Sequence, residues 1–576
     1  MKFKLSTAVL LIIFACQSVL LVGVRWHNEG WKKVIEFDGK GYYDLLPAAF
    51  IRQNLSDQDP FQDFARPVGN RIVNKYYIGT SLLMSPFFTG AWLYNEAMGE
   101  VSDGYTKPFQ VAISLAGLFY LILGLWLLQK ILESLGIRDP VIAIVLFLIT
   151  YGTNLLHYSL MEPGMSHIYS FAMICLFLYS GMFYFIRNKN SLLLLCAACF
   201  AIIVLIRPVN GVVILLLPFL AGSKTVFQEL FRKKTLLLYA LLLILAIVSL
   251  QLPAWYLQTG QWLIWSYPGE GFYFFHPEIL NVLFSYKKGL FLYTPLALLS
   301  LAGFIQLYRI NRFAFRSLLL TLIIATWVIA SWWSWAYAGS YSQRAFVEYL
   351  PLFAILLAFL LNFSPKTRPF LLGCCGLFLI LNAVQYYQFH NEILDPNYMN
   401  KGKYWYVFLK TSPDYVRCLG GIQDDRPFSK EPPVLLATLN KTFPGDGHNI
   451  PAARFDSVKN NYAPGLDVAG IPSLSKTSRI YLEISLSRYE LIANASSGAR
   501  LVVEVKTPDE KTGYTYSVRM NDYPADVCCQ WRSYDYTFDM PAISSPADRI
   551  HFSIQDSAAN KFCIGHFQAR LWGIKQ

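Results

Sequence analysis

The chain contains a series of long apolar runs that carry almost no charge. The clearest cover residues 109–128, 141–156, 236–252, 318–333 and 370–384. A helix needs about 20 apolar residues to cross a hydrocarbon core about 30 Å thick. A buried helix of a soluble protein would explain one such run, but not a series joined by short charged loops. The pattern therefore predicts a polytopic α-helical membrane protein.

The basic residues indicate which loops face the cytoplasm. The formal net charge is +12, from 49 Lys and Arg against 37 Asp and Glu, and such a charge also suits a nucleic-acid partner. Its distribution argues against that partner, because the basic residues gather at the N-terminus and in alternate short loops. Loops rich in Lys and Arg stay in the cytoplasm. We therefore expect membrane lipids and no nucleic acid as partners.

The order of the runs predicts about eleven spans. Residues 5–24 are expected to be a retained signal anchor, since the residues that follow are not a small-residue cleavage site. A long outer loop, 25–107, comes next. Its apolar segment 78–93 is expected to lie at the interface or to be re-entrant, because a crossing there would move the next basic loop outside. The other spans are expected at 108–129, 140–157, 166–186, 191–206, 211–222, 235–256, 289–308, 317–336, 347–363 and 369–389.

An odd number of spans places the tail outside the cytoplasm. From about residue 390 the composition becomes that of a soluble domain. Alternating apolar residues at 479–486, 500–505 and 549–554 predict strands. We expect residues 1–390 to form the membrane domain, 391–470 an irregular linker, and 471–576 an extracytoplasmic β-sandwich or jelly roll. A disulfide from Cys563 to Cys528 or Cys529 is expected there.

Polar side chains that suit chemistry gather at the outer ends of the expected helices. They are Asp38, Tyr42, Tyr43, Asp44 and Lys75 in the first outer loop, and Glu162, His167, Arg207 and Arg344 at later outer ends. Ionisable groups at membrane depth are costly, so they are functional candidates. Arg and Lys bind phosphate oxygens, and a carboxylate accepts a proton from a hydroxyl. The set suits a lipid phosphate and a sugar.

Residues 1–390 resemble the GT-C superfamily of membrane glycosyltransferases, which includes the protein O-mannosyltransferases and the lipid A aminoarabinose transferases. These proteins place an acidic residue in the first outer loop, where this chain has Phe37-Asp38-Gly39-Lys40-Gly41-Tyr42-Tyr43. Glu162 matches a second acidic residue of the next outer loop, and Arg207-Pro208 resembles a basic turn after the fifth span. Lys75-Tyr76-Tyr77-Ile78-Gly79 stands where many members have a Lys-Pro-Pro-Leu-like segment, and it keeps the lysine but lacks both prolines.

The resemblance implies transfer of a hexose or pentose from a polyprenyl-phosphate donor on the outer face of the membrane. Asp38 would deprotonate a hydroxyl of a glycan, lipid or protein acceptor, and Glu162 would be the second catalytic acid. Lys75, Arg207 or Arg344 would hold the departing lipid phosphate. Transfer with a single base is expected to invert the anomeric centre. The expected location is a bacterial inner membrane with a periplasmic tail.

Three alternative hypotheses about the function stay open. A flippase or transporter of lipid-linked saccharides would need charges deep within the spans and internal repeats. A transferase like the O-antigen ligases would use a lipid diphosphate donor. In a structural or sensory protein, the C-terminal tail would carry the function. No cofactor is certain, and a divalent cation, Mg²⁺ or Mn²⁺, shared by Asp38 and Glu162 is left open.

Overall fold

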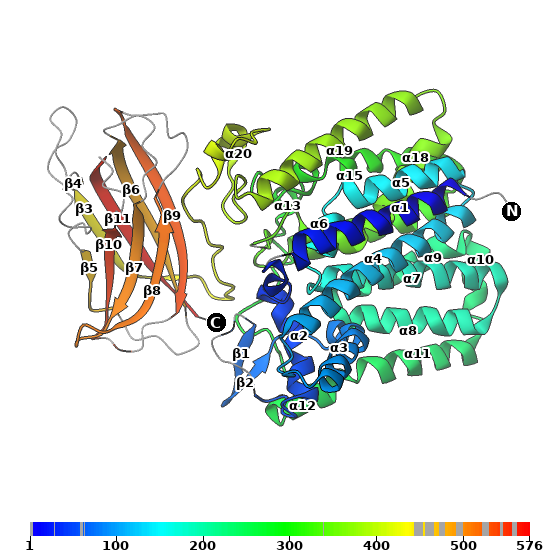
Figure 1. Ribbon diagram of the computed structural model, residues 1–576, viewed down its shortest axis with the longest axis horizontal. Coiled ribbons are helices and arrows are strands. Elements are labelled where there is room, and N and C mark those ends of the chain that lie inside the picture. The colour runs from blue at the N-terminus through cyan, green and yellow to red at the C-terminus, as the bar shows by residue number, and fades with distance from the viewer. Residues whose placement is uncertain are drawn as a thin grey trace.

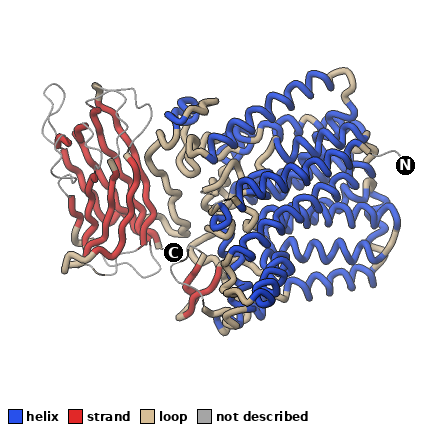
Figure 2. Tube along the Cα trace, viewed as in Figure 1, coloured by secondary structure: helices blue, strands red, loops and turns tan. Residues whose placement is uncertain are grey.

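The chain forms a helical body and a β domain, joined by the segment that follows residue 390 (Figure 1 and Figure 2). The computed structural model describes residues 4–27, 29–57, 62, 64–337, 339–442, 453–455, 466–471, 479–490, 499–520, 529–541, 545, 547–555 and 562–575. Cys528, one expected disulfide partner, lies outside these residues, so the disulfide stays a prediction.

The helical body contains the apolar segments that the sequence predicts. Within the described part of the chain, seven helical segments are long and apolar enough to cross a membrane: Leu5–Trp26, Lys107–Ser134, Ser166–Arg187, Lys234–Thr259, Arg312–Ala330, Arg344–Phe363 and Arg368–His390. Four shorter apolar helices are Asp139–Tyr151, Asn190–Ile206, Pro208–Ala221 and Pro295–Ile310. Each of the eleven expected spans falls on one of these segments. The composition is that of a multi-pass membrane protein, and the number of crossings stays a prediction.

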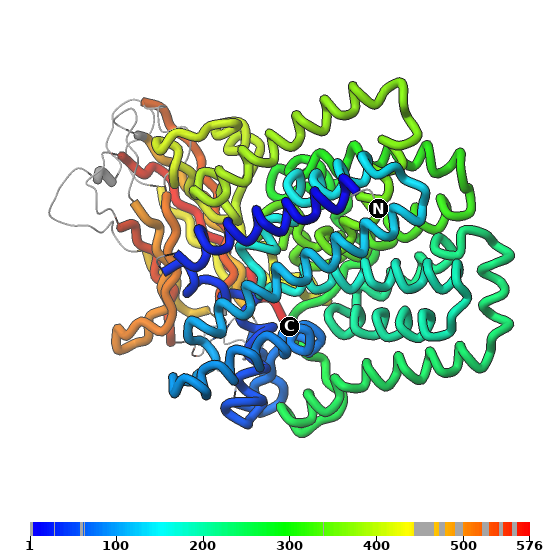
Figure 3. The backbone as a smooth tube through the Cα atoms, turned by 45° about the vertical axis from the view of Figure 1, so that its right-hand side comes forward, coloured from blue at the N-terminus to red at the C-terminus, as the bar shows by residue number. Residues whose placement is uncertain are grey.

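The helices run back and forth along the body, as Figure 3 shows. They are α1 (Leu5–Leu20), α4 (Lys107–Ser134), α5 (Asp139–Tyr151), α7 (Ser166–Arg187), α8 (Asn190–Ile206), α9 (Leu217–Ala221), α11 (Lys234–Val248), α12 (Gln251–Thr259), α15 (Pro295–Leu301), α16 (Gly303–Ile310), α17 (Arg312–Ala330), α18 (Leu350–Phe363) and α19 (Arg368–His390). The N-terminus and the connecting helix α10 (Lys224–Leu230) lie at the end away from the β domain (Figure 1). That end carries the basic connections expected in the cytoplasm.

The segment 25–107, which the sequence predicts to be the first outer loop, is built from short elements rather than an open loop. Asp38 lies in the first turn of α2 (Phe37–Phe50), where the sequence suggested a glycine-containing loop. A two-stranded hairpin of β1 (Ala65–Val68) and β2 (Arg71–Asn74) follows. The apolar segment 78–93 becomes α3 (Gly79–Met98), which packs against α4. Its expected place at the membrane interface stays a prediction.

The β domain is an antiparallel sandwich of two sheets. One sheet has the strand order β5-β10-β7-β8 and the other β3-β11-β6-β9, with β4 paired to β11. The strands are β3 (Val434–Thr442), β4 (Ala453–Phe455), β5 (Leu466–Val468), β6 (Arg479–Glu490), β7 (Arg500–Lys506), β8 (Thr512–Arg519), β9 (Trp531–Pro541), β10 (Arg549–Gln555) and β11 (Phe562–Ile574). One apolar core contains side chains of both sheets. The sandwich is as expected, and the jelly-roll order stays a prediction.

The expected boundary of the β domain at residue 471 is too late. Strands β3, β4 and β5 lie in the region assigned to an irregular linker, yet they belong to the two sheets. β3 pairs with β11 at the edge, and most of its residues are partly or fully exposed on both faces. A strand of this kind lacks the apolar alternation by which sequence identifies strands. The true connection includes α20 (Lys401–Val407) and the strip 420–431.

Candidate active site

Asp38 and Arg344 form an ion pair at the end of the helical body that faces the β domain. Nη2 of Arg344 donates to Oδ2 of Asp38 at 2.7 Å, and the Asp38 side chain is 28% exposed. Burial raises the pKa of Asp38, but the charges of Arg344 and Lys75 and a hydrogen bond from Tyr76 outweigh it, so the pKa lies well below its ordinary value. The carboxylate is ionised and accessible.

A close contact between two glycines brings the two candidate acids together. Gly39, next to Asp38, packs against Gly164, and a Cβ at position 39 would lie 3.2 Å from the carbonyl carbon of Gly164. Glu162 is in the same short loop. Its Oε1 lies 3.2 Å from Nε2 of His157. Burial raises the pKa of Glu162, but His157 and Arg344 lower it below its usual range.

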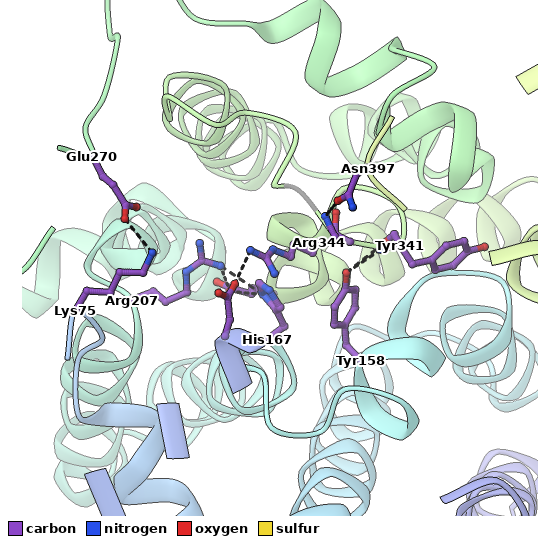
Figure 4. Close-up of polar contacts among 12 residues, drawn as sticks. Lys75, Tyr158, His167, Arg207, Glu270, Tyr341, Arg344 and Asn397 are labelled. Carbon is purple, nitrogen blue, oxygen red and sulfur yellow. Dashed lines mark hydrogen bonds and ion pairs between the residues drawn. The ribbon is translucent and has the colours of Figure 1, made fainter. Parts of the chain in front are cut away.

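Arg344 is held by the loop 331–343 between α17 and α18. Lys288 donates to the carbonyls of Ser340 and Pro396, and the Tyr341 amide donates to the Tyr158 hydroxyl at 3.2 Å. Burial lowers the pKa of Lys288 to about 7. Figure 4 shows Tyr158 and Tyr341 beside Arg344.

Backbone strain occurs on both sides of the ion pair. Phe37, next to Asp38, has φ +49°, and Tyr337 and Ser342 of the loop before Arg344 have φ +49° and +56°. Non-glycine residues rarely adopt this left-handed region, and such strain clusters at functional sites. The strained positions flank both members of the Asp38–Arg344 pair.

Lys75, whose charge also lowers the pKa of Asp38, is paired with Glu270. Its Nζ is 2.9 Å from Oε1 of Glu270, which also pairs with Nη2 of Arg66 at 2.7 Å. The Lys75 ammonium lies near the rings of Tyr76 and Tyr267, 5.4 and 5.6 Å from their centroids. A partly accessible ammonium beside aromatic rings suits a phosphate and a sugar.

A third cation, Arg207, is anchored by the buried Glu348. Nη1 of Arg207 and Nδ1 of His167 lie 2.8 and 2.9 Å from Oε1 of Glu348, and the Asn210 amide donates to Oε2. The Glu348 side chain is only 1% exposed, against 18% for Arg207. In Figure 4, Arg207 and Arg344 extend toward the region around His167. The buried acid thus orients a cation whose outer part stays accessible.

The helical turn separates the expected residues of α2 into two groups. Tyr42 shares a face with Asp38 and stacks on Tyr76 with ring centroids 4.0 Å apart. Tyr43 and Asp44 point elsewhere, because successive helical residues are about 100° apart. Tyr43 donates to the Gly104 carbonyl, while Asp44 pairs with Arg52 at 3.0 Å and accepts from Tyr105. The structure places these two in contacts that anchor α2, not in the cluster around Asp38.

The site therefore gathers Asp38, Tyr42, Lys75, Glu162, His167, Arg207 and Arg344, and it adds Glu270 and Glu348, which the sequence reasoning missed. Glu270 lies in a stretch rich in tryptophan and tyrosine, and no local pattern marks this acid as a partner of Lys75. Glu348 is an acid within an apolar run, four residues after Arg344. A charge buried in an apolar run is costly, and this cost is the sequence signal that marks Glu348 as a candidate.

A divalent cation shared by Asp38 and Glu162 does not fit this arrangement. Arg344 already lies on Asp38 and acts electrostatically on Glu162, while Glu162 is next to His157. Among the described residues, no group of three or more His, Cys, Asp and Glu side chains is placed to hold a metal ion. The positive charge between the two acids comes from the chain itself.

No protein-family model and no curated protein matches the sequence. Among solved structures, the chain is similar to ArnT from Cupriavidus metallidurans bound to undecaprenyl phosphate, with 14% identity and a TM-score of 0.42 over 71% of this chain and 70% of that one. It is also similar to the oligosaccharyltransferase AglB from Archaeoglobus fulgidus in complex with an inhibitory peptide and a dolichol-phosphate, with 12% identity and a TM-score of 0.39 over 72% of this chain. That match spans 59% of the archaeal chain.

Proposed function

We propose that the chain is a membrane glycosyltransferase that moves a sugar from a polyprenyl-phosphate donor to a hydroxyl acceptor at the outer face of the membrane. The observation that carries this proposal is an accessible carboxylate, Asp38, flanked by the cations of Arg344 and Lys75. A base next to cations is what transfer from a phosphate leaving group needs. The acceptor is a glycan, a lipid or a protein.

The three cations bind the phosphate in this proposal. Lys75, Arg207 and Arg344 each have a carboxylate partner, so their charges are compensated within the protein. A phosphate oxygen competes with Asp38 for Arg344, because guanidinium binds phosphate as well as carboxylate. When Arg344 shifts to the donor phosphate, Asp38 loses a stabilising charge and its basicity rises. Donor binding thereby activates the base.

Asp38 then takes the proton of the acceptor hydroxyl. The acceptor oxygen bonds to the anomeric carbon while the bond from that carbon to the phosphate oxygen breaks, and the lipid phosphate leaves with the electron pair. The cations stabilise the charge that develops on that phosphate. A single displacement with one base inverts the anomeric centre. Glu162 orients the acceptor from the neighbouring loop.

The test is sugar transfer by purified protein in liposomes, with polyprenyl-phosphate sugars or the matching diphosphates as donors and an envelope glycan extract as acceptor. Transfer from the monophosphate donor is expected, with a loss of at least about 100-fold in Asp38→Asn. Glu29→Gln, an exposed acid of the same outer segment, is the control. Transfer only from the diphosphate donor would favour the alternative hypothesis of a transferase like the O-antigen ligases. Full activity of Asp38→Asn would remove Asp38 from the mechanism.

A further inference from the structure

A polar cavity lies where the β domain meets the connecting segment. Its volume of about 380 Å³ is within the range of small-molecule sites. One wall is β9, and the other is formed by α20 and the strip after it. The lining residues are Asn400, Lys403, Gly421, Ile422, Gln423, Arg532, Ser533, Tyr534, Asp535 and Tyr536.

The cavity is built on the open edge of a sheet. β9 is the last strand in its sheet, and the connecting strip pairs with this edge: the Thr537 amide donates to Ile422 at 3.1 Å, and the Asp424 amide donates to Thr537 at 3.2 Å. Backbone groups alternate between the two edges of a strand. The N–H and C=O groups of Ser533 and Asp535 therefore point to the same edge, into the cavity.

The side chains around the cavity include hydrogen-bond donors and acceptors, and charges of both signs. Lys403 donates to the carbonyls of Gly420 and Tyr398, so its charge serves the connecting segment. Arg532, Asp535 and Gln423 supply a cation, an anion and an amide. The Tyr534 ring is braced by the Arg488 guanidinium, 4.7 Å from its centroid. The Asp535 carboxylate in the lining disfavours a phosphate, whereas a mixture of donors and acceptors suits the hydroxyl groups of a saccharide.

The strip beside the cavity is tied to the loop that carries Arg344. The Gln423 carbonyl accepts from Lys287 at 3.3 Å, and Asp425 pairs with Lys287 at 2.7 Å. Ser334, in that loop, donates to Asp425 at 2.8 Å. An occupant of the cavity therefore contacts a strip that is hydrogen-bonded to the loop 331–343 before Arg344.

We propose that this cavity binds a saccharide, and that the saccharide is a distal part of a glycan acceptor. The assignment of the saccharide to an acceptor rests on the proposed function, whereas the binding of a saccharide does not. The β domain would then hold a long acceptor while its terminal hydroxyl is glycosylated at Asp38.

The test measures binding of fluorescently labelled linear trisaccharides of glucose, mannose, galactose and N-acetylglucosamine to the full chain in nanodiscs. At least one is expected to bind, with a loss of at least tenfold in Asp535→Ala and in Ser533→Trp, which fills the cavity from an exposed position. Lys511→Gln, on an exposed turn of the same domain, should bind as wild type. No binding to wild type, or equal binding by all variants, overturns the proposal.

Asp38→Asn separates this inference from the proposed function. It should lose transfer and keep trisaccharide binding. If wild type binds the sugar through β9 but transfers nothing, the proposed function is wrong, while the proposal that the cavity binds a saccharide is supported. In an active enzyme, Asp535→Ala should raise KM for long acceptors with kcat unchanged, and an unchanged KM would overturn the link to the acceptor.

Discussion

Arg344 and Asp38 are 306 positions apart in the sequence, yet their side chains form a 2.7 Å ion pair at the end of the helical body that faces the β domain. The pair lowers the pKa of the carboxylate and occupies the guanidinium that is proposed to receive the phosphate. The state of the base and the binding of the donor are therefore linked through one contact.

Removal of Arg344 should shift the pH dependence of transfer. Arg344 favours the charged form of Asp38, so Arg344→Gln should raise the Asp38 pKa, by about one unit or more. The acid limb of kcat/KM against pH should then move to higher pH, in addition to any fall in rate. Arg316→Gln, at the opposite end of the body, is the control. An acid limb that stays in place would mean that Arg344 does not tune the base.

Glu348→Gln should destabilise the protein strongly. It leaves Arg207 without its buried partner, and removing one member of a buried ion pair costs about 3–5 kcal/mol. Denaturant unfolding in detergent micelles measures the loss, with Glu29→Gln expected to change stability by less than about 1 kcal/mol. The double variant Arg207→Gln/Glu348→Gln should recover part of the loss. Strictly additive effects would show that the pair is not coupled.

Gly39→Ala should reduce activity although alanine favours helices. The added Cβ would press on Gly164 at 3.2 Å and move the Asp38 and Glu162 segments apart. Misplacement of about 1 Å costs on the order of 100-fold, so a loss of 10-fold or more in kcat/KM is expected. Gly90→Ala in α3, where nothing lies within 4 Å, is the matched control. Equal activity of the two variants would contradict the importance of this contact.

The β domain should become less stable as the pH rises through about 6. Burial raises the pKa of Asp539 to about 6, although Arg479 opposes this. A carboxyl group with a raised folded-state pKa stabilises the fold below its unfolded pKa, near 4, and loses that contribution through pH 6, by about 1.4 kcal/mol per unit of difference.

Pulse proteolysis of the full chain in urea at pH 4.5 and 7.5 measures this effect. Asp539→Asn should remove the pH dependence of the β domain, while the exposed Asp509→Asn should retain it. If Asp539→Asn responds to pH as wild type does, another group is responsible.

The elements of the fold could be predicted wherever the pattern was local. Each expected span falls on an apolar helix, because length and apolar composition are properties of one segment. Strands β6, β7 and β10 were found from alternation. β3 was missed because an edge strand exposed on both faces carries no such pattern. The location of the sheets' edges, and with it the cavity beside β9, was beyond sequence reasoning.

The sequence alone shows which polar residue types stand near the ends of the expected helices, and it indicates Asp38, Lys75, Arg207 and Arg344 as candidates. The tertiary structure decided their pairing: Asp38 with Arg344, Lys75 with Glu270, Arg207 with Glu348. It also turned Tyr43 and Asp44 away from the site. A buried charge needs a partner, and contacts between distant segments determine which residue that partner is. Helix formation and apolar periodicity, by contrast, depend on near neighbours in the sequence.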